Sequence, residues 1–263
     1  MALEQNRVAA VQSGASRVMA ILDVLSAADA SAFPDGLSVA DVSRLLGREK
    51  SVVSRQLKSL LETGLVARDE ESGRYDLSWR LFALAVRAGD QRLTKLAAPL
   101  MLRLTEAVRE RTYLTVLSDG EVLTVHSESS RRSIEAVNWV GRTIPVNRSS
   151  SGMALLMDHD DEHILEMVRR GDDGVSASEA RAFLAKVQEA RQRGYSVANR
   201  MFDPELTGIG APVRDFSGRI KAAVNISGPA FRVEPHTQVF GAHLLATVRA
   251  LQSSLCPEAR STA

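Results

Sequence analysis

Hydrophobic residues recur at helical spacing along the first third of the chain. A first amphipathic helix is indicated by four of them, Val18, Ile21, Leu22 and Leu25. Ser38 is a good N-cap for a second helix, with Asp41 three residues later in the arrangement of a capping box. Gly47 ends that helix, so a turn and a third helix are expected after it.

The third helix has two unlike faces. Its apolar stripe falls at i, i+4, i+7 and i+8, at Val53, Leu57, Leu60 and Leu61. Its other face is short, polar or cationic, and only Glu62 at the far end is acidic. This pattern is typical of the recognition helix of a helix-turn-helix, which enters the DNA major groove. The alternative is a small helical hairpin that binds nothing.

Charge supports the DNA-binding interpretation locally rather than globally. The chain has a net charge of +1, and residues 1–85 hold 10 Lys+Arg against 11 Asp+Glu, a net of −1. Five cations against Glu49 nevertheless give 5 − 1 = +4 between Arg44 and Lys58. A local patch on a neutral domain favours a sequence-specific reader over a general nucleic-acid coat. The helix residues predicted to contact DNA are Arg48, Lys50, Ser51, Val52, Ser54, Arg55 and Lys58.

Two short strands are predicted after this helix, over residues 65–68 and 74–77, joined by the turn-rich loop DEESG. A β-hairpin in this position is the wing of a winged helix-turn-helix, and its tip commonly meets the phosphate backbone. Arg74 is the predicted contact there. Asp69, Glu70 and Glu71 at the same tip oppose a close approach to phosphate.

The rest of the chain alternates strands and helices. Residues 79–111 read as helix, with Pro99 as a break or kink and a domain boundary near residue 90. Strands at 113–117 and 121–126 flank a Ser-Asp-Gly turn, and further strands are expected at 209–213 and 220–226. The predicted fold is therefore α+β, with a winged helix-turn-helix at residues 1–90 and a GAF- or PAS-like α/β effector-binding domain at residues 91–263.

Several other classes of protein are disfavoured. No run approaches the ~20 apolar residues of a membrane span, and the N-terminus lacks the pattern of a secretory signal. A single cysteine, Cys256, favours a reducing cytoplasm. His159 and His163 have the spacing of a metal pair but no evident third ligand. No catalytic motif stands out, so neither a metal nor a cofactor is expected.

From about Ser16 to Leu255 the chain resembles the IclR-type bacterial transcriptional regulators. The stretch RQRGYSVANRMFDPELTGIGAPVRDFSGRIKAAVNISGPAFRV follows the family's effector-domain signature, and IPVNRSSSGMALL matches its pocket-lining loop and helix. The winged-helix segment resembles the family less specifically. The resemblance implies dimers or tetramers that bind palindromic operators and respond to a small organic effector.

The resemblance also maps the family's effector pocket onto this chain. The implied residues are Ser150, Ser151, Gly152, Ala198, Gly208, Asn225 and Ser227. Ala198, Gly208 and Met153 stand where Asp, Cys and Lys are common in the family, which predicts a roomier and less polar pocket. Trp139 and Met153 are then candidate apolar walls, and the expected ligand is larger or more aromatic than a two- or three-carbon acid.

The sequence thus predicts a cytoplasmic, ligand-responsive repressor or activator of a catabolic or metabolic operon. Its expected partners are double-stranded DNA, a small-molecule effector and further copies of the chain, with no membrane. One alternative is a small-molecule-binding enzyme whose N-terminal unit serves oligomerisation. Another is a winged-helix protein that binds a protein rather than DNA.

Overall fold

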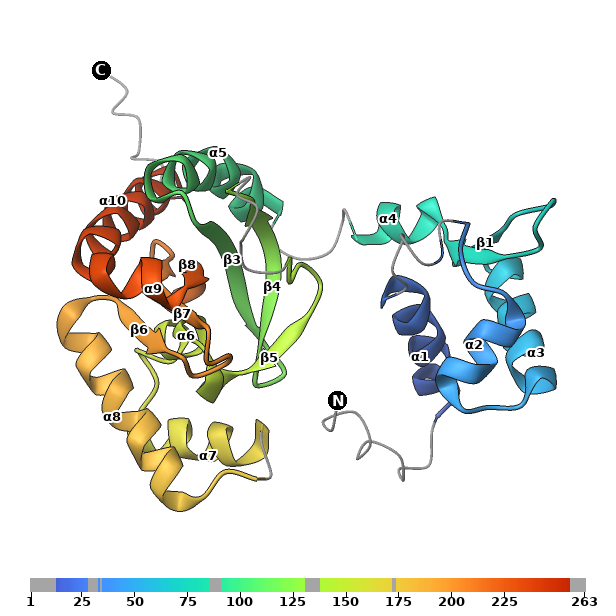
Figure 1. Cartoon of the computed structure of the whole chain (residues 1–263), viewed down its shortest axis with the longest axis horizontal. Helices are drawn as coiled ribbons and strands as arrows, with labels where there is room; N and C mark the ends of the chain where they lie inside the picture. Colours follow the sequence, from blue (N-terminus) through green and yellow to red (C-terminus); the bar gives the residue numbers. More distant parts are fainter. Residues whose placement is uncertain are drawn as a thin grey trace. The chain divides into compact units, whose positions relative to one another are not determined.

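The chain folds into two compact units, Met1–Gln91 and Arg92–Ala263, each with its own hydrophobic core. They are drawn in Figure 1 from a computed structural model, which describes residues 13–27, 33, 35–85, 91–130, 138–171 and 174–255. The boundary predicted near residue 90 adjoins residues 86–90, which lie outside the described residues.

The first unit contains the predicted helices and the predicted wing. Its elements are α1 (Gly14–Ala27), α2 (Val39–Leu46), α3 (Lys50–Glu62), β1 (Val66–Arg68), β2 (Tyr75–Leu77) and α4 (Trp79–Ala85). β1 and β2 pair antiparallel, with Val66 opposite Leu77. Leu37 adds a bridge to the hairpin, because its N–H and C=O both bond to Tyr75. The winged helix-turn-helix fold is therefore confirmed.

The predicted capping of α2 is confirmed in detail. The Ser38 hydroxyl accepts a hydrogen bond from the N–H of Asp41 at 3.2 Å, and the Asp41 carboxylate accepts one from the N–H of Ser38 at 3.1 Å. Gly47 ends the helix in the left-handed conformation, at a φ of 62°. These two ends set the length of α2 and therefore the position at which α3 begins.

The apolar stripe of α3 forms part of the first core, with one exception. Val53, Leu57 and Leu60 are buried against Ile21 and other residues of α1 and α2. The prediction for Leu61 was wrong, because its side chain is 38% exposed. At 100° per residue, Leu61 lies about 80° around the helix from Val53, at the margin of the buried stripe.

The second unit is built on a six-stranded antiparallel sheet of order β5-β4-β3-β8-β7-β6. The strands are β3 (Arg111–Ser118), β4 (Glu121–Glu128), β5 (Thr143–Pro145), β6 (Ser196–Asn199), β7 (Leu206–Arg214) and β8 (Ile220–Pro229). The predicted β3–β4 hairpin is present, and Asp119 and Gly120 in its turn have positive φ angles of 51° and 81°. An Asp-Gly pair tolerates that conformation, which explains why the turn was readable from sequence.

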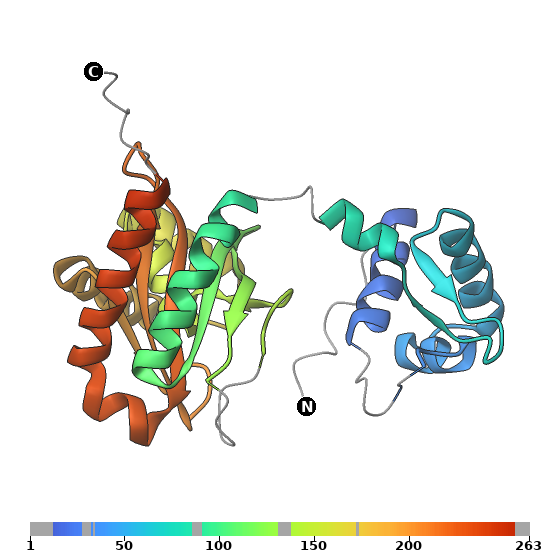
Figure 2. The same ribbon diagram turned by 90° about the horizontal axis from the view of Figure 1, so that it is seen from above.

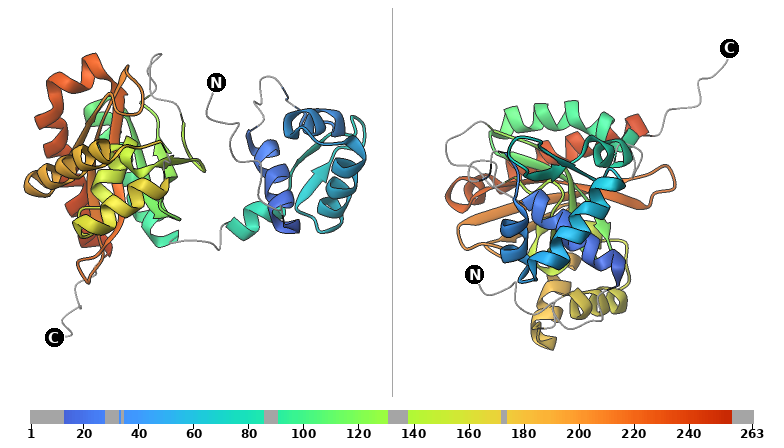
Figure 3. Two further views of the ribbon diagram at one scale, coloured as in Figure 1. Left: turned by 90° about the horizontal axis from the view of Figure 1, so that it is seen from below. Right: turned by 90° about the vertical axis from the view of Figure 1, so that its right-hand side faces the viewer.

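Helices cover both faces of this sheet. α5 (Gln91–Val108) and α10 (Thr237–Leu255) lie side by side on one face (Figure 2), where Leu114, Ile209 and Ile226 point. The other face carries α6, α7 and α8, the last two seen in front of the strands in Figure 3, left. These three helices and the short helices of the unit are η1 (Val146–Arg148), α6 (Ser150–Leu155), α7 (Asp161–Gly171), α8 (Ala177–Arg193), α9 (Ala230–Val233) and η2 (Glu234–His236).

Pro99 does not break the helix that contains it. α5 runs through Pro99 from Gln91 to Val108, and four of its buried residues follow the proline. The predicted break was therefore wrong, because burial of the apolar face of α5 outweighs the one hydrogen bond that a proline removes.

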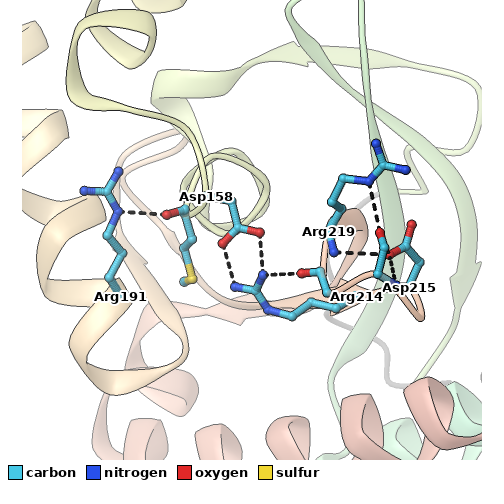
Figure 4. A network of polar contacts seen from close by, with 8 residues as sticks. Asp158, Arg191, Arg214, Asp215 and Arg219 are labelled. Atoms are coloured by element: carbon cyan, nitrogen blue, oxygen red, sulfur yellow. Dashed lines mark hydrogen bonds and ion pairs between the residues drawn. The ribbon is translucent and has the colours of Figure 1, made fainter.

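Ion pairs fasten the turn after α6 to two neighbouring elements. Asp158 accepts hydrogen bonds on both carboxylate oxygens from the guanidinium of Arg214 in β7 (Figure 4). Arg191 in α8 donates from Nε to the carbonyl oxygen of Met157 at 2.8 Å. Arg191 also pairs with Asp161 at 2.8 Å, and this bond, more than any other contact, lowers the pKa of the Asp161 carboxyl. These bonds hold the C-terminal end of α6 against β7 and α8.

Candidate DNA-binding helix and effector cavity

The predicted DNA-contacting residues of α3 lie mostly on one exposed face. Lys50, Ser51, Ser54, Arg55 and Lys58 are all exposed, whereas Val52 is half-buried. Arg55 turns its Nε back to the carbonyl oxygen of Ser51 at 3.3 Å, along its own helix. The exposed face therefore offers hydroxyl groups and three cations together, the donor set that base edges and phosphates accept.

The turn before α3 is fixed by its own hydrogen bonds. The N–H of Arg48 donates to the carbonyl oxygen of Ser43 at 3.0 Å, and the buried Ser43 hydroxyl donates back to the carbonyl oxygen of Arg48. Arg48 is also half-buried, and so less accessible than the cations on α3. Its backbone thus sets the angle of the turn, whatever its side chain contributes to binding.

Arg74 lies differently from the expectation of a phosphate contact at the wing tip. Its Nη1 donates to the carbonyl oxygen of Gly36 at 2.8 Å and lies 3.7 Å from the Asp41 carboxylate. The side chain therefore ties the wing to the start of α2. At the tip, the Asp69 carboxylate accepts bonds from the N–H and hydroxyl of Ser72, and these bonds lower the pKa of that carboxyl.

A cavity opens in the second unit between the sheet and the loop that leads into α6. It encloses about 600 Å³ of empty space, including its open mouth. Residues of all six strands line it, because alternate residues of each strand point to this face. The lining residues are Tyr113, Thr115, Thr124, Trp139, Ile144, Arg148, Ser149, Ser150, Ser151, Ala198, Phe202, Leu206, Gly208, Asn225 and Ser227.

A glycine and two serines hold α6 close to the strands. A Cβ on Gly152 would lie 1.9 Å from the carbonyl oxygen of Val146, so no other residue fits there without a shift of the backbone. The Ser149 hydroxyl caps α6 by accepting a bond from the N–H of Gly152 at 2.9 Å. Ser196, fully buried, donates to the carbonyl oxygen of Ser150 at 2.6 Å. The serine-rich loop is thereby fixed at the cavity wall.

Two groups in the cavity wall lack partners among the described residues. Arg148, half-buried, makes neither a hydrogen bond nor an ion pair there. The Oδ1 atom of Asn225 is buried and likewise accepts no hydrogen bond. A cation without a counter-ion and an unsatisfied buried acceptor are both unfavourable in an empty site. A ligand with an anionic group and a donor would satisfy the two.

Aromatic side chains form another part of the wall. The rings of Trp139 and Phe202 meet edge to face, with their centroids 5.2 Å apart. The guanidinium of Arg142 lies over the Trp139 ring at 5.7 Å. Tyr113 is buried and also lines the cavity. This arrangement can pack against a planar, apolar ligand body.

Seven of the nine residues predicted for the effector site line this cavity: Trp139, Ser150, Ser151, Ala198, Gly208, Asn225 and Ser227. Gly152 and Met153 do not. Met153 is fully buried among the apolar residues beneath α6, so the expectation of an apolar cavity wall at this position was wrong. Gly152 packs on Val146 and shapes the loop rather than the cavity surface.

The absent side chain at residue 208 does not simply enlarge the cavity. A Cβ built on Gly208 would meet the Ser150 hydroxyl at 2.8 Å, so that serine occupies the space. The lining is also more polar than expected, because sequence reasoning missed Arg148 and the hydroxyls of Thr115 and Thr124. Arg148 stands within IPVNRSSSGMALL, the stretch that resembles the family's pocket-lining loop, so the sequence holds a signal for it, whereas Phe202 has no local signal.

The histidine pair lies elsewhere, at the start of α7. The rings of His159 and His163 stack with centroids 5.2 Å apart. Burial, followed by repulsion from His163, lowers the pKa of His159. Over the described residues, no group of three or more His, Cys, Asp or Glu side chains is arranged to hold a metal. No helix in the same residues is long and apolar enough to span a membrane.

Comparison with known families decides the identity of both units. Residues 14–70 match the IclR helix-turn-helix domain, and residues 87–253 match the family described as bacterial transcriptional regulator IclR C-terminal. The chain belongs to the IclR family. It is accordingly a DNA-binding transcriptional regulator with an effector-binding domain, and the alternative of an enzyme finds no support among its relatives.

Individual IclR relatives are similar over nearly the whole chain. The transcriptional regulator KdgR of Escherichia coli (strain K12) is 26% identical over 246 residues, covering 90% of this chain and 93% of KdgR. The Pca regulon regulatory protein of Pseudomonas putida is 26% identical over 203 residues, 75% of this chain and 69% of that protein. A crystal structure of an IclR homologue from Microbacterium hydrocarbonoxydans in complex with 4-hydroxybenzoate superimposes with a TM-score of 0.76 at 26% identity, covering 92% of this chain and 99% of that one.

Proposed function

We propose that this IclR-family regulator responds to an aromatic carboxylic acid bound in the cavity of its second unit. The observation that carries the proposal is that Arg148 has no partner among the described residues and stands in a wall that also holds Trp139 and Phe202. A guanidinium binds a carboxylate with two parallel hydrogen bonds. Its charge is half-buried and has no counter-ion among the described residues, so it favours an anion over a neutral ligand.

The remaining polar groups favour a second polar substituent on the ligand. Oδ1 of Asn225 can only accept, so it suits a hydroxyl or N–H of the ligand. Ser227 lies two residues along the same strand and lines the same cavity. A hydroxylated benzoate has both an anion and such a donor. The 4-hydroxybenzoate complex of the Microbacterium hydrocarbonoxydans homologue supports this class of ligand.

The aromatic part of the wall also bears on the size of the ligand, because Trp139 and Phe202 both line the cavity. A two- or three-carbon acid would leave the aromatic wall without a partner. The ring of a benzoate would pack on Trp139 or Phe202, which favours the larger acid.

A ligand panel tests the effector class. Isothermal titration should give binding of 4-hydroxybenzoate, weaker binding of benzoate, and no binding of 4-hydroxybenzyl alcohol or pyruvate. Arg148→Gln should weaken the 4-hydroxybenzoate affinity by about 1.5–3 kcal/mol, the range for hydrogen bonds to a charged group. Arg169→Gln, in the last turn of α7 and outside the cavity, is the matched control. Pyruvate binding more tightly than every aromatic acid would refute the proposal.

We further propose that α3 reads DNA through Lys50, Ser51, Ser54, Arg55 and Lys58, with Arg48 and Val52 at the edge of the contact and Arg74 supporting the wing. One helix reads only a few base pairs. A dimer or tetramer bound to a palindromic operator would multiply those contacts. Sedimentation of the free protein and of its operator complex measures the stoichiometry, and a monomer on DNA would exclude the oligomer.

Control by the effector requires different affinities for free and DNA-bound protein. DNA recognition is tested first. The protein is titrated against its own upstream DNA at several salt concentrations, with unrelated DNA as the control. The same titration with 4-hydroxybenzoate then measures coupling. Equal operator affinity with and without a ligand that calorimetry shows to bind would rule out this effector.

A further inference from the structure

Beyond the effector class, we propose that Glu234 is a positioning residue that holds Phe202 across the mouth of the cavity and so controls how fast the effector leaves. Glu234 does not line the cavity. It lies at the first position of η2, whereas Phe202 lies in the loop between β6 and β7. The proposal rests on the cavity being the effector site, but the closure itself can be measured without any effector.

Two aromatic rings from separate parts of the chain meet in the wall of the cavity. Trp139 and Phe202 are 63 residues apart in sequence, yet their rings touch edge to face at 5.2 Å. Phe202 is 40% exposed and also lines the cavity, so one side of its ring faces solvent and another faces the site. A side chain in that position separates the interior of the cavity from water.

The two sides of the mouth are held differently. On the Trp139 side, backbone hydrogen bonds join the chain to β4: the N–H of Gly141 donates to the carbonyl oxygen of Thr124 at 2.8 Å, and the N–H of Thr124 donates to the carbonyl oxygen of Arg142 at 3.1 Å. On the Phe202 side, three described backbone bonds involve residues 200–205, and two of them, from the N–H of Arg200 to the carbonyl oxygen of Leu206 at 2.9 Å and from the N–H of Leu206 to the carbonyl oxygen of Asp203 at 3.1 Å, close the loop on its own end. The third joins the carbonyl oxygen of Glu205 to the N–H of Ala230 at 2.8 Å.

The carboxylate of Glu234 also holds the Phe202 loop, through side-chain hydrogen bonds. Its Oε1 accepts a bond from Nε of Arg200 at 3.0 Å, and its Oε2 accepts one from Nη2 of the same arginine at 3.4 Å. Oε1 also accepts a bond from the hydroxyl of Thr207, a fully buried residue of β7, at 3.1 Å. A carboxylate bound by a fork of two donors and a hydroxyl is fixed in direction as well as position.

The backbone at Arg200 needs such support. Its φ angle is 54°, in the left-handed region that residues other than glycine adopt at a cost. The mutual hydrogen bonds raise the pKa of Arg200 and lower that of Glu234, so both groups stay charged. Because Phe202 follows Arg200 by two residues, release of the guanidinium frees the segment that carries the ring.

The test uses Trp139 as its own reporter. The chain has two tryptophans, so Trp79→Phe leaves Trp139 alone to fluoresce. In that background we expect Glu234→Gln to raise the acrylamide quenching constant of Trp139 toward the value of a Phe202→Ala variant, which removes the cover. Thermal unfolding of the same variants separates loop opening from loss of fold.

Glu205→Gln is the matched control. It removes an equal charge near the same arginine, from within the loop that carries Phe202, but its carboxylate accepts no hydrogen bond from the described residues. Its quenching constant should equal that of the parent. Arg200→Ala should act like Glu234→Gln, and the double variant should add nothing, as expected for two groups that act as one contact.

Three results would overturn the proposal. Quenching in Glu234→Gln could equal the parent value, Glu205→Gln could raise it equally, or Phe202→Ala could leave it unchanged. In protein that binds 4-hydroxybenzoate, stopped-flow displacement should also give a dissociation rate about ten-fold faster for Glu234→Gln than for Glu205→Gln. Absence of 4-hydroxybenzoate binding would count against the effector class, while the quenching results would still decide the role of Glu234.

Discussion

Arg80 in α4 donates a hydrogen bond from Nη1 to the carbonyl oxygen of Thr63, which follows α3, at 2.7 Å. Its neighbour Ser78 adds two more, from its hydroxyl to the carbonyl oxygen of Gly64 and from its N–H to the carbonyl oxygen of Leu65 at 3.2 Å. A cation at a helix C-terminus also interacts favourably with the helix dipole. The C-terminal end of α3 is thus bonded to the start of the segment that leads along the chain to the second unit.

This bond gives a first prediction about coupling. We expect Arg80→Ala to lower the free energy that couples effector and operator binding by about 0.5–2 kcal/mol, because α4 would then move without α3. Operator titrations with and without the effector measure that quantity. Operator affinity without effector should change little.

Arg92→Ala is a suitable control for this experiment. Arg92 is also an exposed arginine, and its Nη2 bonds to the carbonyl oxygen of Ser254 within the second unit. Its removal should leave the coupling free energy unchanged. Equal coupling in wild type and Arg80→Ala would show that α4 does not transmit the signal through this bond.

A second prediction separates two roles on α3. Arg55→Ala should weaken specific operator binding by about 1–3 kcal/mol, the range for a bidentate arginine–guanine contact, and leave binding to unrelated DNA nearly unchanged. Lys58→Ala should weaken both and reduce the salt slope by about one, as expected for a phosphate contact. Both residues are exposed, so the circular dichroism spectra should not change. Unaltered operator affinity in Arg55→Ala would contradict its assigned role.

The elements that could be predicted from sequence are those with local causes. The capping box at Ser38 and the left-handed turn at Gly120 are each determined within a few residues, and the structure contains both. The predictions for Leu61 and Pro99 were wrong, because the burial of Leu61 and the continuity of α5 through Pro99 depend on tertiary packing. Local pattern alone does not determine which margin of a helix is covered.

In the cavity, too, the residues with a local sequence pattern could be predicted and those that depend on distant contacts could not. Asn225 and Ser227 could be paired from strand alternation, and the loop at Ser150 and Ser151 from a family resemblance. The meeting of Phe202 with Trp139 depends on two distant loops and has no signature in the local sequence. The role of Glu234 could not be predicted from sequence for the same reason, since it acts through Arg200 and does not line the cavity.

A third prediction concerns acid stability of the first unit. Hydrogen bonds from the hydroxyl and N–H of Ser38, opposed by slight burial and helped by Arg44 and Arg74, lower the pKa of Asp41 from its ordinary value of 3.8. A depressed pKa in the folded state stabilises the protein above the unfolded pKa, and that stabilisation is lost as pH falls through the folded pKa. The melting temperature of Asp41→Asn should therefore lie below that of wild type at pH 7.

The difference between the two proteins should shrink as the pH is lowered from about 5 toward about 3, because wild-type Asp41 then becomes protonated and resembles the variant. Thermal unfolding followed at several pH values gives the comparison. Asp76→Asn serves as the control, since Asp76 is exposed on β2 and its side chain bonds only to the adjacent N–H of Leu77 among the described residues. A wild-type advantage that stays constant down to pH 3 would show that the Asp41 charge plays no part.

The last prediction concerns the glycine that brings α6 against the loop before it. Gly152→Ala would place a methyl group 1.9 Å from the carbonyl oxygen and 2.7 Å from the Cα of Val146. These are backbone atoms, so relief requires movement of η1 relative to α6. We expect a loss of about 1–3 kcal/mol in unfolding free energy, typical of overpacking, which corresponds to a fall of about 2–4 °C in melting temperature for each kcal/mol.

The same movement should also weaken effector binding, because Arg148 and Ser149 on one side of the contact and Ser151 on the other belong to the cavity wall. Gly171→Ala provides the comparison in the same unit. A Cβ there would lie 3.9 Å from the carbonyl oxygen of Gly120, which is an ordinary contact. That variant should keep both its melting temperature and its affinity for 4-hydroxybenzoate. If Gly152→Ala matched it in both measurements, the close approach of α6 to Val146 would not be what shapes the cavity.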